Sequence, residues 1–140
     1  CRSLAKNKEN SIYFITKRDD VGIENVKRVK YSLAREPNRD GHHYIKFLDE
    51  QILYAQAVVR VLLTLKERGV NPDIIFAHSG WGEALFVKEV FPNAKLIIFS
   101  EYYYTARESD TAFINKGNVS IEEACRLVST TAIARISVLL

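Results

Sequence analysis

The chain has 140 residues, of which 47% are hydrophobic and 26% are charged, a composition typical of one compact globular domain and not of a disordered or fibrous chain. Its only two cysteines, Cys1 and Cys125, lie too far apart in sequence for a disulfide scaffold, which predicts a reducing, cytoplasmic compartment. The formal net charge is +3, and residues 1–40 hold ten Lys or Arg against six Asp or Glu. This basic first third predicts either a solvated surface or contact with phosphates or an anionic membrane surface.

Strand-like and helix-like periodicities alternate along the chain, which is typical of the α/β class. In chain order, we predict the end of a helix (1–7), two strands (11–16 and 24–31), a long loop (33–43), a long helix (44–68), a strand (73–78), a helix from 81 or 82 to 90, a strand (96–99) and a last helix (121–140). Gly69, with Pro72 shortly after it, predicts the end of the long helix. Ser120 and Glu123 form a predicted capping box at the start of the last helix.

The strands at 73–78 and 96–99 are apolar without alternation, as in parallel strands that are covered on both faces. The sequence therefore predicts a three-layer, Rossmann-like α/β sandwich with a mostly parallel sheet. The chain begins with Cys, contains no Met and ends in an apolar run. We therefore expect residues 1–140 to be a single partial domain that lacks its first strand and is cut at both ends.

Two polar clusters follow predicted strands, at the sheet edge where ligands of open parallel sheets bind. The first contains His78, Ser79, Gly80, Trp81, Gly82 and Glu83. Its glycines allow a tight turn with close backbone approach, and the amides of the following helix favour an anionic or hydroxyl-rich ligand. The alternative is structural, with His78 as a packing residue and Trp81 as a plug at the end of the sheet.

The second cluster contains Ser100, Glu101, Tyr102, Tyr103 and Tyr104. A carboxylate followed by tyrosines is suited to sugars, because aromatic rings stack on the apolar faces while Glu and the hydroxyls bind the alcohols. Alternatively, Tyr102 and Tyr104 are core or interface rings, and Glu101 pairs with a base such as Arg107. A carboxylate at a strand end needs a partner of some kind.

These clusters carry a resemblance to a known family. Three stretches match in register: Asn-Pro-Asp-Ile-Ile-Phe-Ala-His-Ser-Gly-Trp-Gly-Glu-Ala-Leu-Phe (71–86), Phe-Pro-Asn-Ala (91–94) and Glu-Tyr-Tyr-Tyr (101–104). Over residues 1–110 the chain resembles the N-terminal domain of family 4 glycosyltransferases, in the branch that reads His-Pro-Gly-Trp-Gly-Glu and later Glu-Phe-Tyr-Tyr. Ser79 stands where that pattern has Pro, and Tyr102 where it has Phe.

The resemblance implies the acceptor-side half of a retaining, hexosyltransferase-type enzyme with two Rossmann-like domains (GT-B), whose donor-binding C-terminal domain is absent here. Glu101 and His78 would line the cleft between the domains, with Glu101 orienting the acceptor hydroxyl. Gly80, Trp81, Gly82 and Glu83 would shape the base of the site, and Tyr102, Tyr103 and Tyr104 would bind substrate.

The partners that the resemblance implies are a nucleotide-sugar, bound by the missing domain, and a sugar or lipid-linked acceptor. No metal, other cofactor or nucleic acid is expected, and the protein would be cytoplasmic with peripheral contact to the inner face of the membrane. A noncatalytic α/β binding or regulatory module is the alternative. It is disfavoured because only His78 and Glu101 occupy strand ends, in place of the aspartate cluster of receiver domains.

Overall fold

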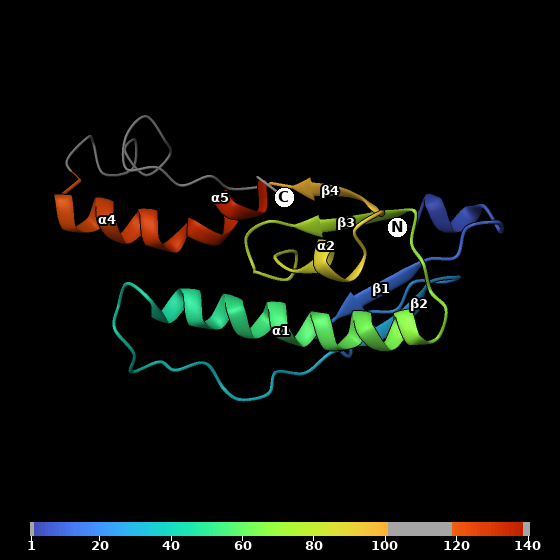
Figure 1. Cartoon of the computed structure of the whole chain (residues 1–140), viewed down its shortest axis with the longest axis horizontal. Helices are drawn as coiled ribbons and strands as arrows, with labels where there is room; N and C mark the ends of the chain where they lie inside the picture. The colour runs from blue at the N-terminus through green and yellow to red at the C-terminus, as the bar shows by residue number, and fades with distance from the viewer. Residues whose placement is uncertain (1, 101–118, 139–140) are drawn as a thin grey trace. The chain divides into compact units, whose positions relative to one another are not determined.

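A computed structural model describes residues 2–100 and 119–138, which fall into two compact units, 1–33 and 34–140. The predicted α/β class with parallel strands is confirmed, since β1 pairs with β2 and β3 pairs with β4, each in parallel (Figure 1). The described strands form two sheets of two strands each. The expectation of a single partial domain without its first strand stays a prediction.

The first unit contains a short 3₁₀ helix and one parallel strand pair. Its elements are η1 (Leu4–Lys6), β1 (Tyr13–Thr16) and β2 (Lys27–Lys30). Both predicted strands are confirmed, but β2 begins three residues later than predicted. Asn25 has φ 59°, and the amide of Val26 donates to the carbonyl of Ile23 at 3.2 Å. This turn prevents the extended backbone that a strand needs.

The long helix of the second unit, α1 (Lys46–Glu67), is confirmed with both ends within two residues of the prediction. Its buried residues are Gln51, Leu53, Ala55, Ala57, Val58, Leu62 and Leu65. Five of them recur at spacings of three and four residues and so share one face: Gln51, Ala55, Val58, Leu62 and Leu65. Gly69 has φ +81°, its amide donates to Lys66 O at 2.9 Å, and the amide of Val70 donates to Leu65 O at 3.0 Å. The predicted glycine stop is therefore confirmed.

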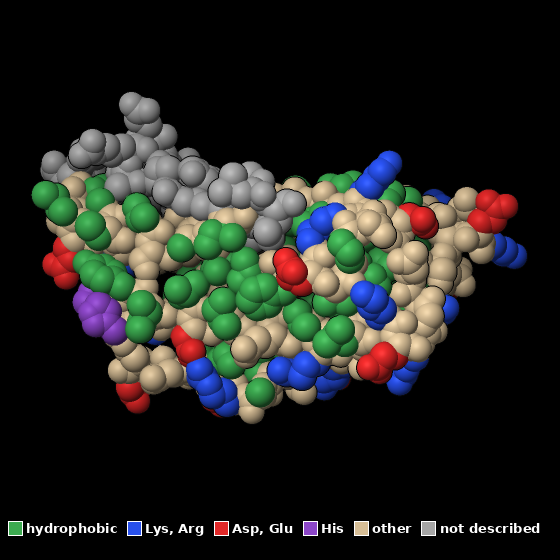
Figure 2. Space-filling model, viewed as in Figure 1, with side chains coloured by type: hydrophobic (Ala, Val, Ile, Leu, Met, Phe, Trp, Pro, Cys, Tyr) green, Lys and Arg blue, Asp and Glu red, His purple; other side chains and the backbone are tan. Residues whose placement is uncertain are grey.

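The strands β3 (Ile74–His78) and β4 (Lys95–Phe99) are confirmed, but full coverage of both faces is not. Ile74 and Phe76 are 49% and 64% exposed, and Ile97 and Phe99 on β4 are 44% and 65% exposed. An apolar run shows that both faces of a strand can be covered, whereas actual coverage depends on neighbouring layers. Hydrophobic side chains also reach the surface on the face of the molecule drawn in Figure 2.

The helix predicted from residue 81 or 82 begins later, and α2 spans only Val87–Val90. The physical reason is Gly82, whose φ of +87° lies in the left-handed region that a right-handed helix cannot contain. Residues 81–86 instead form turns, in which the amide of Leu85 donates to Gly82 O at 3.0 Å.

The last predicted helix consists of two helices, α4 (Ile121–Thr130) and α5 (Ala132–Val138). The capping box prediction is supported, because the Ser120 hydroxyl accepts from the amide of Glu123 at 3.1 Å. The break falls at Thr131, whose hydroxyl donates to Leu127 O at 3.0 Å, while that of Thr130 donates to Arg126 O at 2.9 Å. Such side-chain bonds to carbonyls one turn back bend helices. Both helices pack against α1.

The loop before α1 is held by Asp49, in the first turn of that helix. Both terminal nitrogens of Arg35 donate to the Asp49 carboxylate, and the amide of Asn38 donates to Asp49 Oδ2 at 3.3 Å. These hydrogen bonds, that from Arg35 first, hold the pKa of the Asp49 carboxyl below its ordinary value.

We expect acid to release this loop. Because the folded pKa of Asp49 is lowered, the stabilisation is present above the unfolded pKa and is lost as the pH falls below about 4. Arg35→Gln should raise the Asp49 pKa, measured by NMR titration of its carboxyl carbon. Arg39→Gln, in the same loop, is the control and should leave the pKa of Asp49 unchanged. An Asp49 titration that Arg35→Gln does not move would contradict this account.

Candidate functional site

The carboxyl ends of β3 and β4 lie side by side and bring the first predicted polar cluster next to Ser100. His78 is paired in register with Phe99, and the amide of Ser79 donates to Phe99 O at 3.2 Å. The hydroxyls of Ser79, which is buried, and Ser100 are 3.4 Å apart. The first cluster therefore adjoins the first residue of the second. Glu101, Tyr102, Tyr103 and Tyr104 lie outside the described residues, so their predicted roles stay predictions.

His78 is half-buried and its ring orientation is fixed by the turn that follows it. Its Nδ1 atom accepts a hydrogen bond from the amide of Gly80 at 3.1 Å. Because that bond uses the Nδ1 lone pair, the neutral ring carries its hydrogen on Nε2. The ring centroid lies 5.9 Å from that of Phe99, edge-on, and 6.4 Å from that of Trp81. His78 thus combines a packing role with a defined tautomer.

Trp81 is the only tryptophan of the chain, and its side chain is 57% exposed. It does not plug the end of the β3–β4 sheet in a buried position, as the structural alternative required. An exposed indole next to a histidine ring can stack on the apolar face of a sugar while polar neighbours bind its hydroxyls. Glu83, the last residue of the predicted cluster, is half-buried.

The glycines that flank Trp81 both lie in close contacts, but only the contact at Gly82 excludes a side chain. A Cβ atom on Gly80 would lie 3.3 Å from Cε1 of His78. A Cβ atom on Gly82 would lie 2.8 Å from Cα and 2.7 Å from the carbonyl carbon of Gln51 on α1, and nearer still to its oxygen. Gly82 is buried and has φ +87°, so both space and backbone angle require glycine there.

Gln51 is the residue of this region that sequence reasoning missed. It is 2% exposed, and its Nε2 donates to Gly80 O at 2.6 Å. Its Oε1 is buried and has no hydrogen-bond partner among the described residues. A signal was present in the sequence, since Gln51 lies four and seven residues before the buried Ala55 and Val58, so a polar residue falls on the apolar stripe.

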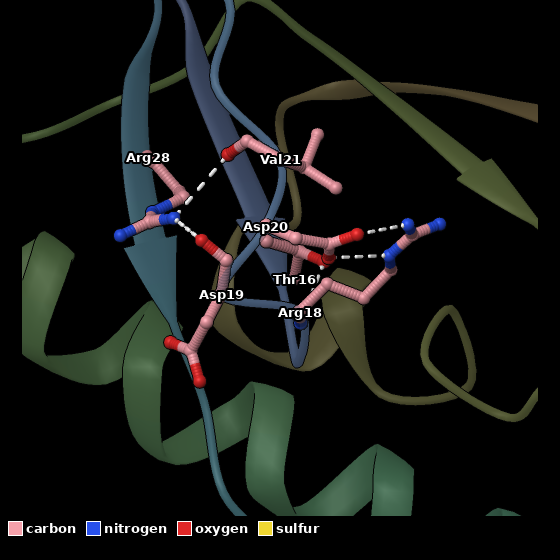
Figure 3. A network of polar contacts seen from close by, with 6 residues as sticks. All are labelled: Thr16, Arg18, Asp19, Asp20, Val21 and Arg28. Carbon is pink, nitrogen blue, oxygen red and sulfur yellow. Dashed lines mark hydrogen bonds and ion pairs between the residues drawn. The ribbon is translucent and has the colours of Figure 1, made fainter.

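Polar contacts in the first unit hold the loop that follows β1 (Figure 3). Arg18 pairs with Asp20 through Nε at 2.9 Å, and Arg28 of β2 donates to the carbonyls of Asp19 and Val21. The guanidinium of Arg18 holds the pKa of the Asp20 carboxyl below its ordinary value. Both side chains are 68% exposed, so this pair contributes little stability. These contacts favour the solvated-surface interpretation for Arg18 and Arg28.

The adjacent histidines His42 and His43 are exposed, and their rings stack at a centroid distance of 4.7 Å. Over residues 2–100 and 119–138, no three His, Cys, Asp or Glu residues are grouped so that they could hold a metal ion. Within the same residues, no helix has the length and apolarity to span a membrane. The expectations about metals and membrane contact stay predictions.

Comparison with known proteins assigns the family. A sequence model of the glycosyl transferase family 4 group matches residues 8–138. The chain therefore belongs to the glycosyl transferase family 4 group, and its general function is glycosyl transfer. Searches of curated proteins and of solved structures each find no match. The match includes both strand ends of the candidate site.

Proposed function

We propose that the chain is the acceptor-side domain of a retaining GT-B glycosyltransferase, which transfers a hexosyl group from a nucleotide-sugar to an acceptor hydroxyl. The family match over residues 8–138 is the observation that carries this proposal. The finer assignment rests on residues 78–83, which read His-Ser-Gly-Trp-Gly-Glu and so resemble the branch with the Gly-Trp-Gly-Glu pattern. A second Rossmann-like domain would bind the donor.

In this proposal the residues around β3 hold the acceptor. The exposed ring of Trp81 stacks on a sugar face, and Nε2 of His78 faces the acceptor as a hydrogen-bond donor. Gly80 and Gly82 keep the turn close to α1, and Glu83 binds acceptor hydroxyls. Holding the acceptor oxygen in line with the anomeric carbon is the main contribution that such a domain can make to the rate.

Glu101 and the three tyrosines extend this site in the proposal, since Glu101 directly follows Ser100 at the end of β4. Its carboxylate orients the acceptor hydroxyl, and Tyr102, Tyr103 and Tyr104 contact the substrate. The donor-side domain stabilises the leaving nucleoside diphosphate. We expect a cytoplasmic protein that needs no metal, binds no nucleic acid and uses a sugar or a lipid-linked acceptor, the latter at the membrane surface.

A transfer assay with a panel of nucleotide-sugars tests this proposal. The complete protein should release nucleoside diphosphate in the presence of acceptor, and NMR of the product should show the anomeric configuration of the donor. The 140-residue chain alone should give no turnover, because a reaction in a cleft between two domains needs both walls. Turnover by the chain alone would refute the two-domain assignment, and an inverted product would refute retention.

A further inference from the structure

Gln51 connects α1 with the turn that carries Trp81. Its side-chain amide donates to the carbonyl of Gly80 at 2.6 Å, the residue directly before Trp81. Its own backbone lies against Gly82, the residue directly after Trp81, so closely that no Cβ atom fits between them. One residue of α1 therefore contacts both neighbours of Trp81, and the two contacts use different parts of Gln51.

The same turn fixes His78. The amide of Gly80 donates to Nδ1 of His78, so the Gly80 peptide groups are bonded to Gln51 through the carbonyl and to His78 through the amide. Movement of the Gly80 backbone would therefore change the orientation of the His78 ring and of the Trp81 ring beside it. Gln51 sets the position of both rings without itself reaching the surface, since it is 2% exposed.

The side-chain oxygen of Gln51 argues against a purely stabilising role. Oε1 is buried and accepts no hydrogen bond from the described residues. A buried acceptor without a partner is unfavourable, and an apolar side chain of the same length would avoid this cost. An amide at this buried position therefore costs stability relative to an apolar side chain. The hydrogen bond from Nε2 to Gly80 O is the contact that an apolar residue could not make.

We propose that Gln51 is a positioning residue for acceptor binding, which holds the Gly80–Trp81–Gly82 turn so that the indole of Trp81 is presented to a sugar ring in one orientation. This inference rests on the proposed function for its ligand, a sugar acceptor. Gln51 acts through the turn and does not touch the substrate. Its hydrogen bond to the turn is a property of this chain that can be tested without any sugar.

The first test measures the turn itself in the 140-residue chain, where Trp81 is the only tryptophan. Gln51→Met keeps the length of the side chain and removes the donor, so the fluorescence anisotropy of Trp81 should fall as the turn loosens. Gln56→Met is the matched control, because Gln56 is an exposed residue of the same helix, and it should leave the anisotropy unchanged. Unchanged anisotropy in Gln51→Met would overturn the positioning role.

A measurement on the unsubstituted chain keeps the proposal testable if Gln51→Met does not fold. The side-chain NH₂ protons of Gln51 should exchange with solvent at least about tenfold more slowly than those of Gln56, because burial and the bond to Gly80 O protect them. Equal exchange rates for the two side chains would overturn the proposal without any variant.

The second test measures function in the complete protein. Gln51→Met should raise KM for the acceptor about tenfold with a much smaller change in kcat, while Gln56→Met changes neither. A fall in Trp81 anisotropy without a change in KM would overturn the role in acceptor binding. If even the unsubstituted protein transfers no sugar, the proposed function fails, whereas the anisotropy and exchange results still decide whether Gln51 holds the turn.

Discussion

Replacing Gly82 by alanine is expected to lower the free energy of unfolding by about 2–5 kcal/mol, the largest stability effect that we predict for the described residues. A left-handed backbone costs a residue with a Cβ atom about 1–2 kcal/mol, and Gly82 has φ +87°. The new Cβ atom would also lie only 2.7 Å from the carbonyl carbon of Gln51, and overpacking of this kind costs about 1–3 kcal/mol. Urea denaturation measures the loss.

Gly69→Ala is the control that separates these two causes. Gly69 has a similar φ of +81°, but no atom lies within 4 Å of the position of its Cβ. This variant should therefore lose only the backbone part, about 1–2 kcal/mol. If Gly82→Ala were no more destabilising than Gly69→Ala, the close approach between Gly82 and α1 would be wrong, and so would the basis for the role of Gln51.

Glu101→Gln in the complete protein is expected to lower kcat by roughly 100-fold or more while the protein still folds. The substitution keeps the shape of the side chain and removes its charge. In the proposed function, the carboxylate accepts a hydrogen bond from the acceptor hydroxyl and holds its oxygen toward the anomeric carbon. Loss of one such contact in the transition state costs about 3–4 kcal/mol in favourable cases.

Measuring kcat and the melting temperature of the same Glu101→Gln variant distinguishes catalysis from structure. If Glu101 only pairs with a base such as Arg107, turnover should stay near normal and the melting temperature should fall. That result would remove Glu101 from the catalytic assignment. Glu67→Gln, an exposed position at the end of α1, is the control for loss of one carboxylate and should change neither quantity.

Local sequence patterns predicted the long helix α1 and the strands β3 and β4 with bounds close to those of the structure. Buried residues recur at helical spacing in α1 from Gln51 to Leu65, and Gly69 ends the helix because the left-handed C′ position favours glycine. The strands β3 and β4 were predicted from short continuous apolar runs, and their parallel pairing was predicted from the class. The proximity of Ser79 and Ser100 agrees with this prediction, because the carboxyl ends of neighbouring parallel strands meet at one edge of a sheet.

The late start of α2 could not be predicted in the same way. A glycine within a helical pattern costs about 1 kcal/mol relative to alanine, which does not by itself exclude a helix, and no pattern within residues 81–90 predicts that Gly82 takes a positive φ. Gly82 lies in close contact with the backbone of Gln51 in α1. A pattern within residues 81–90 contains no information about that contact. The exposed faces of β3 and β4 have a similar explanation, because coverage is supplied by other parts of a fold.

The sequence by itself determined the α/β class, the bounds of α1, β3 and β4 to within two residues, and the resemblance to family 4 glycosyltransferases, because each depends on short-range periodicity or on a motif. Only the tertiary structure decided which residues meet at the site. The bond from Gln51 to Gly80 joins residues 29 positions apart, and the edge-on contact of His78 with Phe99 requires the register of two strands. Such contacts depend on how the chain packs. The contacts of Gln51 with the turn that contains Trp81 could therefore be identified only from the tertiary structure.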